Sequence, residues 1–124
     1  MTLQEIFDKV AVHLLTQGCK SGQPNPSMGF QCLYRGPNGT QCAVGHLIKD
    51  EHYSPEMETM CVAEEIVIQA LIDSGVKCGP VTLNLLTDLQ ILHDGTPAED
   101  WCEDLRVVAK RHKLDPYVID MESV

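Results

Sequence analysis

Cys42 is the residue best placed for chemistry, because it lies where a strand-like run meets a helical one. The dipole and free N–H groups at a helix N-terminus can stabilise a thiolate, the form of cysteine that acts as a nucleophile. A general base would come from His46, one helical turn later, or from His93, with Asp94 orienting the imidazole. The pattern leaves open a cysteine-dependent hydrolase or transferase in which these four residues are catalytic.

The same segment contains a weak candidate metal site. Cys32, Cys42 and His46 would supply the sulfur and nitrogen ligands that zinc prefers, and the last two stand four residues apart. Structural zinc sites are usually marked by two closely spaced ligand pairs, whereas only one pair is close here. We therefore expect no metal or other cofactor, and keep a zinc-stabilised binding module as an alternative.

A structural interpretation of these residues is simpler. The six cysteines are irregularly spaced, no CxxC occurs, and free cysteine is among the most buried residue types. We expect Cys42 to pack inward and His46 to bond a nearby backbone group. His93, in the last turn of a helix, would complement the helix dipole, and Asp94 would begin the exit turn. On this interpretation the protein is not an enzyme.

The element that positions Cys42 is predicted to be a β-hairpin from Phe30 to Val44. Two strand-like runs, 30–35 and 40–43, flank the turn formers of 36–39. The preceding residues, 20–29, are rich in glycine, proline and serine and are expected to form an exposed loop.

Pro37 determines the register of this hairpin. A three-residue turn that begins at Pro37 keeps its missing N–H out of the ladder and puts Gly39 at positive φ. This turn places Tyr34 opposite Cys42 and brings Cys32 to the same face of the sheet.

Apolar residues at helical spacing, bounded by caps and proline, predict the helices. The expected spans are about 3–17, with a Thr2/Glu5 capping box and a stop at Gly18; 54–74, opened by Ser54 and Pro55; 79–93, opened by Gly79 and Pro80; and a last helix opened by a capping box at 96–99. The side chains expected to face inward are Leu3, Ile6, Phe7, Val10, Leu14, Met60, Ala63, Val67, Ala70, Leu71, Val81, Leu85, Leu89, Leu92, Trp101, Leu105, Val108 and Ala109.

These elements predict a mainly α fold with a short β-hairpin, of the α+β class, in which about four to five helices pack around the hairpin. The 124 residues suffice for one core, so we expect a single domain over 1–124. Only six residues are aromatic, and the core should therefore be largely aliphatic.

Net charge limits the partners. Eighteen acidic and nine basic side chains give a net charge of −9, which repels phosphate backbones and anionic membranes and favours basic partners. We expect no direct binding to nucleic acid or membranes. The first residues show no basic flank leading into an apolar run, which indicates a cytoplasmic protein. The candidate binding residues are Tyr34, Arg35, Glu51, Glu56, Glu58, Asp100, Glu103 and Asp104.

Several segments carry a family resemblance. The runs CLYRGPNG (32–39) and CAVGHLI (42–48), with YSPEME (53–58), LQILHD (89–94) and Trp101, resemble a group of small uncharacterised proteins encoded by bacteriophages and prophages. The likeness covers most of the domain. It implies a phage-carried accessory protein that binds a host enzyme or defence complex, and it carries over no catalytic residues.

The preferred hypothesis is therefore a stoichiometric binder in the cytoplasm of a bacterial host. It would inhibit a defence protein, as anti-CRISPR proteins do, or a nucleic-acid-handling protein, by placing acidic faces against a basic surface. An isolated hairpin also presents unpaired edges. A homodimer that pairs hairpin edges is a further option.

Overall fold

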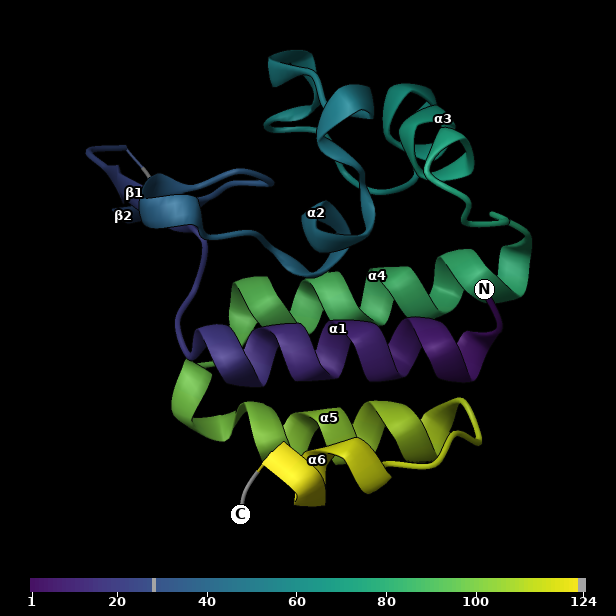
Figure 1. Cartoon of the computed structure of the whole chain (residues 1–124). Coiled ribbons are helices and arrows are strands. Elements are labelled where there is room, and N and C mark those ends of the chain that lie inside the picture. Colours follow the sequence, from purple (N-terminus) through teal and green to yellow (C-terminus); the bar gives the residue numbers. More distant parts are fainter. Residues whose placement is uncertain (28, 123–124) are drawn as a thin grey trace.

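The computed structural model describes residues 1–27 and 29–122. Its helices are α1 (Leu3–Gln17), α2 (Ala43–Leu47), α3 (Glu65–Asp73), α4 (Pro80–Gly95), α5 (Trp101–Arg111) and α6 (Tyr117–Glu122), and its strands are β1 (Gly22–Asn25) and β2 (Gly29–Cys32). α1 packs against α4, α5 and α6, while α2 packs across α1 and α4. Figure 1 shows this helical layer, with the hairpin, α2 and α3 on one side of it. The expected α+β class is confirmed.

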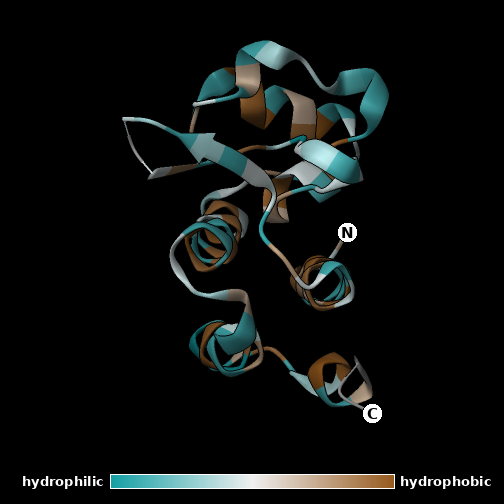
Figure 2. Cartoon of the chain, turned by 90° about the vertical axis from the view of Figure 1, so that its left-hand side faces the viewer, coloured by the Kyte–Doolittle hydropathy of each residue, from teal (hydrophilic) through white to brown (hydrophobic). Residues whose placement is uncertain are grey.

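The buried apolar side chains form one connected cluster. Trp101 and Phe7 are fully buried within it, and most of the other members are aliphatic, as the composition predicts. Figure 2 shows that the hairpin is mostly hydrophilic, whereas the helices carry the strongly hydrophobic residues. None of the helices in the described part of the chain has the length and apolar character needed to cross a membrane.

α1 forms as its sequence predicts. Thr2 accepts the Glu5 N–H while Glu5 accepts the Thr2 N–H, which completes the capping box. Gly18 ends the helix at φ 70°, a conformation that glycine adopts without steric cost. The buried face includes Phe7 and Leu14, which hold α1 against the core.

α4 also begins and packs close to the prediction. Pro80 occupies its first turn, and Leu85, Leu89 and Leu92 are buried. The prediction for Val81 is wrong: this side chain is 60% exposed. It lies in the first turn of the helix.

The start of α5 differs from the predicted capping box at 96–99. A short 3-10 turn, Ala98–Asp100, precedes the helix, and no side chain caps it. The Thr96 hydroxyl donates to the Asp104 carboxylate, and the Thr96 carbonyl accepts from the Trp101 indole N–H, 2.9 Å away. Thr96 thus anchors α5 through Trp101, the first residue of the helix, and through Asp104, about one turn later. The predicted inner residues of this helix, beginning with Trp101, are buried.

The hairpin lies earlier in the chain than predicted. β1 pairs antiparallel with β2, so that Gly22 faces Cys32 and Asn25 faces Gly29. The expected loop over 20–29 is therefore wrong. The proline and glycine residues of this segment led to the prediction of a loop. Pro24 is nevertheless tolerated in β1, because both strands of a two-stranded sheet are edge strands. Gly29 supplies the positive φ, 81°, at the start of β2.

The predicted pairing of 30–35 with 40–43 is reduced to a single bridge between Arg35 and Gln41. That bridge has the predicted register, in which Tyr34 and Cys42 are opposite, and Gly39 has the predicted positive φ of 75°. The ladder ends there because Cys42 already caps α2. On the other side, the Tyr34 N–H donates to the Glu58 carboxylate rather than to a strand.

The predicted helix over 54–74 is also wrong in its first half. Ser54 caps only a 3-10 turn, Pro55–Met57, and Thr59 takes a left-handed φ of 71° that stops helical geometry. α3 begins at Glu65 and buries Val67, Ala70 and Leu71 as predicted. The inward prediction fails for the two residues before it, since Met60 and Ala63 are exposed.

Candidate functional site

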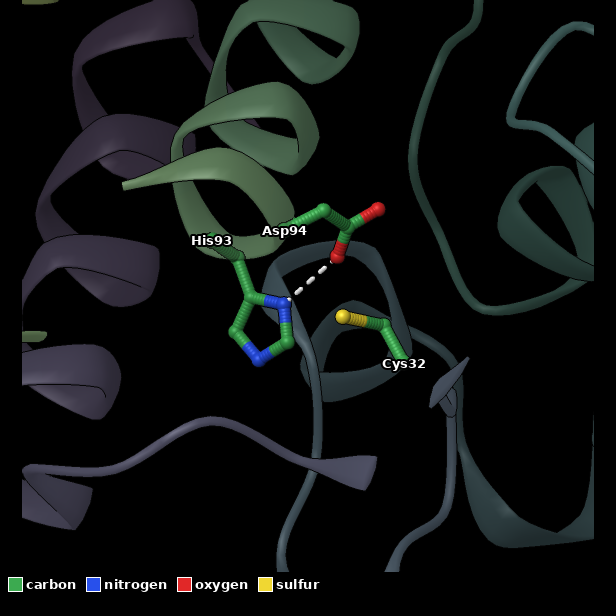
Figure 3. A group of neighbouring side chains, drawn as sticks. All are labelled: Cys32, His93 and Asp94. Carbon is green, nitrogen blue, oxygen red and sulfur yellow. Dashed lines mark hydrogen bonds and ion pairs between the residues drawn. The ribbon is translucent and has the colours of Figure 1, made fainter. Parts of the chain in front are cut away.

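The densest group of chemically capable side chains consists of Cys32, His93 and Asp94, which we call the Cys32 cluster. One ligand atom from each lies within 4.8 Å of the others. Cys32 ends β2, and the other two occupy the last turn of α4 (Figure 3). In the part of the chain that the structure describes, no other three or more cysteine, histidine or acidic residues converge in this way.

Hydrogen bonds fix the tautomer of His93. The ring is fully buried, its Nε2 accepts the Ser21 backbone N–H at 2.9 Å, and its Nδ1 lies 2.7 Å from Asp94 Oδ1. Because Nε2 accepts, the proton of the neutral ring is on Nδ1 and is donated to Asp94. Asp94 thus orients the imidazole, as the adjacent residue types predict. The single lone pair of His93 is occupied, so the ring offers nothing to a metal unless the Ser21 bond breaks.

Asp94 extends this network to α2. Its Oδ1 also accepts the Gln90 side-chain N–H at 2.9 Å, and the side-chain oxygen of Gln90 accepts the Val44 backbone N–H at 3.0 Å. The Asp94 backbone carbonyl accepts from the Lys20 ammonium group. The cluster therefore joins the end of α4 to the base of the hairpin and to the first turn of α2.

The Cys32 thiol is a poor nucleophile in this setting. Burial raises its pKa to about 11, and the nearby Asp94 carboxylate adds to the effect by its charge and by accepting a hydrogen bond. The thiol is therefore protonated at neutral pH. The geometry favours a structural hydrogen-bond network over a catalytic dyad or a zinc site.

Cys42 caps α2, as its position in the sequence predicts, but without forming a thiolate. Its Sγ accepts the Gly45 N–H at 3.2 Å. Burial raises the pKa of this thiol to about 12, and this exceeds the lowering by the Gly45 bond. The side chain packs into the core, where it is 1% exposed. Desolvation therefore outweighs the effect of the helix N-terminus, which agrees with the expected inward packing of Cys42 and disfavours the alternative of a nucleophile.

His46 is directed to other partners than Cys42. Its Nδ1 lies 2.9 Å from the Gln41 side-chain oxygen, a side-chain partner rather than the predicted backbone group. Its ring stacks on that of His13. The group of potential ligands around Cys32 contains His93, and His46 is not part of it. The predicted metal set of Cys32, Cys42 and His46 is thus not the set that the fold brings together.

Three members of the predicted binding set, Tyr34, Arg35 and Glu58, are held in internal contacts. Tyr34 is buried, and Glu58 accepts the N–H groups of Tyr34 and Arg35 together with the Tyr53 hydroxyl. The Arg35 guanidinium donates to two backbone carbonyls and to Asp50, and lies 4.9 Å above the Tyr53 ring. These side chains stabilise the loop that carries Tyr53.

The other predicted binding residues lie at the surface. Glu51, Glu56, Asp100 and Glu103 are exposed, whereas Asp104 is half-buried and accepts from Thr96. The sequence is unevenly charged around them: residues 50–105 contain thirteen of the eighteen Asp and Glu residues and one of the nine Lys and Arg residues, Lys77. This acidic stretch forms the loops beside α2, then α3, α4 and the start of α5 (Figure 1).

Sequence reasoning missed the cluster around Cys32 because its contacts cross 61 positions of the chain, from Cys32 to His93. It grouped Cys32 with Cys42 and His46, and it assigned His93 and Asp94 to Cys42 instead. The adjacent His93 and Asp94 were the available signal, and they do form the predicted pair. Comparison of the chain with family models, with curated proteins and with solved structures found no match.

Proposed function

We propose that the protein is a stoichiometric binding protein whose acidic surface contacts a partner with a basic surface. The observation that carries this proposal is the segregation of charge: over residues 50–105, thirteen carboxylates are accompanied by a single lysine. Several of these carboxylates are exposed, including Glu51 and Glu103. Such a surface attracts a basic partner over long range and accelerates its association.

The chemistry of the thiols supports binding over catalysis. Cys32 and Cys42 both have a raised pKa, so that neither supplies a thiolate at neutral pH. The histidine nearest to Cys32 already accepts a backbone N–H. A cysteine-dependent hydrolase or transferase would need a thiolate and an imidazole nitrogen that is free to accept a proton.

The family resemblance indicates what the partner is. A phage-carried binder acts on a bacterial host protein, and proteins that handle nucleic acid, including defence complexes, carry basic surfaces that bind phosphate. An acidic protein competes for the same surface. We propose an inhibitor of such a host protein, acting in the host cytoplasm, with no metal or cofactor of its own.

The first experiment measures how salt affects the affinity. The protein is immobilised, host proteins are retained from a lysate at low salt, and the retained basic protein is purified and titrated. Affinity should fall steeply as salt rises, because exposed charges are screened. An affinity that salt leaves unchanged would overturn the proposal.

A pair of matched variants separates charge from shape. Changing Glu51 and Glu56 to Gln, Asp100 to Asn and Glu103 to Gln removes four exposed charges, and should weaken binding and flatten its salt dependence. The control changes Glu51, Glu56 and Glu103 to Asp and Asp100 to Glu. This variant keeps every charge and should bind as the unchanged protein does. Equal losses in the two variants would contradict an electrostatic contact.

A further inference from the structure

An apolar groove of about 650 Å³ lies between β2, the loop 59–62 and α4. Three large hydrophobic side chains that line it are exposed: Phe30 by 43%, Met60 by 39% and Ile91 by 63%. They come from three separate segments of the chain. Exposed apolar residues that gather around one concavity are typical of a binding surface, whereas single ones are ordinary.

The walls of this groove are fixed within the protein itself. The Tyr34 hydroxyl donates to the Met60 carbonyl at 2.6 Å, which ties the loop 59–62 to the chain that follows β2. Val62 is buried at the inner end of this loop. On the opposite wall, Gln90 is held between Asp94 and the Val44 N–H. A preformed site loses little entropy when it is filled.

The groove is also negatively charged at its edge. Two of its walls, 59–62 and the face of α4, belong to the acidic stretch 50–105, and no lysine or arginine lines the groove in the described part of the chain. Asp94 lines it with a side chain that is 43% exposed. One of its carboxylate oxygens bonds His93 and Gln90, and the other points away from the cluster (Figure 3).

We propose that this groove receives one apolar side chain of the partner, from a segment that carries lysine or arginine on either side of it. The inference rests on the proposed binding function and specifies its contact point. The apolar walls take the side chain, and the partly exposed Asp94 carboxylate attracts the flanking cations. A second copy of the chain fits less well, because each copy carries a net charge of −9 and would bring like charge to the groove.

The probe is a fluorescein-labelled peptide with a central leucine flanked by lysines, and binding is followed by fluorescence anisotropy. Ile91→Ser and Met60→Ser should each weaken binding about tenfold or more, the effect of losing a buried aliphatic contact. Val81→Ser is the matched control, because Val81 is 60% exposed on the same helix but does not line the groove. It should bind the peptide as the unchanged protein does. Peptides with serine for leucine, or glutamate for lysine, should bind weakly.

Methyl NMR provides a second measurement that does not depend on variants. The Met60 methyl signal should shift when the peptide is added, whereas that of Met121, which is 67% exposed on α6, should stay in place.

The outcomes distinguish the groove from the wider function. If binding is steeply salt-dependent but Ile91→Ser and Val81→Ser behave alike, the groove is overturned and the acidic binding function stands. If Ile91→Ser weakens binding and salt does not, the proposed electrostatic function fails and the groove is retained only as an apolar site. Failure of the lysine peptide to bind at all overturns the inference. So does a dimer, seen by sedimentation, that Ile91→Ser dissociates, since the occupant would then be a second copy.

Discussion

The imidazole rings of His13 and His46 are stacked, with centroids 3.9 Å apart and planes within 2° of parallel. His13 comes from α1 and His46 from α2, so the pair joins the helical layer to the segment that follows the hairpin. Gln41 bonds both rings, His13 through its backbone carbonyl and His46 through its side chain. Two stacked rings cannot both be charged without repulsion, and this contact therefore depends on pH.

Acidification should destabilise the protein through this pair. Burial lowers the pKa of His46 to about 4, and the charges of His13 and Lys9 add to the effect; burial also lowers the pKa of His13. In the unfolded chain both histidines have the ordinary histidine pKa of about 6.5. As pH falls from about 6.5 towards 4, the unfolded state binds more protons than the folded state, and the free energy of unfolding decreases.

The measurement is urea denaturation across this pH range for the unchanged protein and for His46→Asn. Asparagine can still donate towards Gln41 but does not titrate. The stability advantage of the unchanged protein should be largest at neutral pH and should shrink as the buffer is acidified. A difference that stays constant with pH would show that His46 titrates as a free histidine.

Gly45→Ala should destabilise α2. A Cβ on this residue would lie 2.4 Å from the Tyr34 carbonyl oxygen, which is backbone and cannot rotate away. We expect a loss of about 1–3 kcal/mol, the usual effect of overpacking a core. Gly95→Ala serves as the control, because nothing lies within 4 Å of its Cβ position, and it should be neutral or slightly stabilising. Equal stability of the two variants in thermal melts would contradict this packing.

The six thiols should react with iodoacetamide in the order of their exposure. Cys19 and Cys61 are exposed and should be labelled first, whereas Cys42 is buried with a raised pKa and should be labelled last. Mass spectrometry of digested protein gives each rate, and labelling in urea, where all the thiols are accessible, is the control. Fast labelling of Cys42 in the folded protein would revive the hypothesis of a cysteine-dependent enzyme.

Local signals predicted the helices that local chemistry determines. The Thr2/Glu5 capping box, Gly18 and Pro80 act on their own neighbours, and α1 and α4 form where they indicate. The helix prediction failed over 54–64 because the conformation of this segment depends on a distant contact: Glu58 bonds the backbone of Tyr34, 24 residues away. A helical pattern cannot reveal such a competitor.

The hairpin and the candidate sites likewise combine features set by neighbouring residues with features set by distant contacts. β1 has no strand pattern in its own residues and forms because β2 pairs with it. Asp94 beside His93 was visible in the sequence, but Ser21, which fixes the tautomer, lies 72 residues away. The groove was not predictable either, since Phe30, Met60 and Ile91 form a surface only after folding.

Replacement of His93 should weaken the junction between α4 and the hairpin. In His93→Phe an aromatic ring is kept, but the buried Ser21 N–H loses its acceptor and Asp94 loses a donor. An unsatisfied buried donor costs about 1–3 kcal/mol. His112→Phe is the matched control, because the bond of His112 to Asp88 is only partly buried and water can replace it.

Hydrogen exchange localises the effect to this junction. The Ser21 amide should exchange much faster in His93→Phe than in the unchanged protein, whereas His112→Phe should leave its exchange rate as it was. A purely global loss of stability would accelerate the slowest core amides of α1 to the same degree. If Ser21 exchanges no faster than they do, the bond to His93 does not hold the hairpin, and the cluster around Cys32 would have to be reconsidered as a site for a ligand.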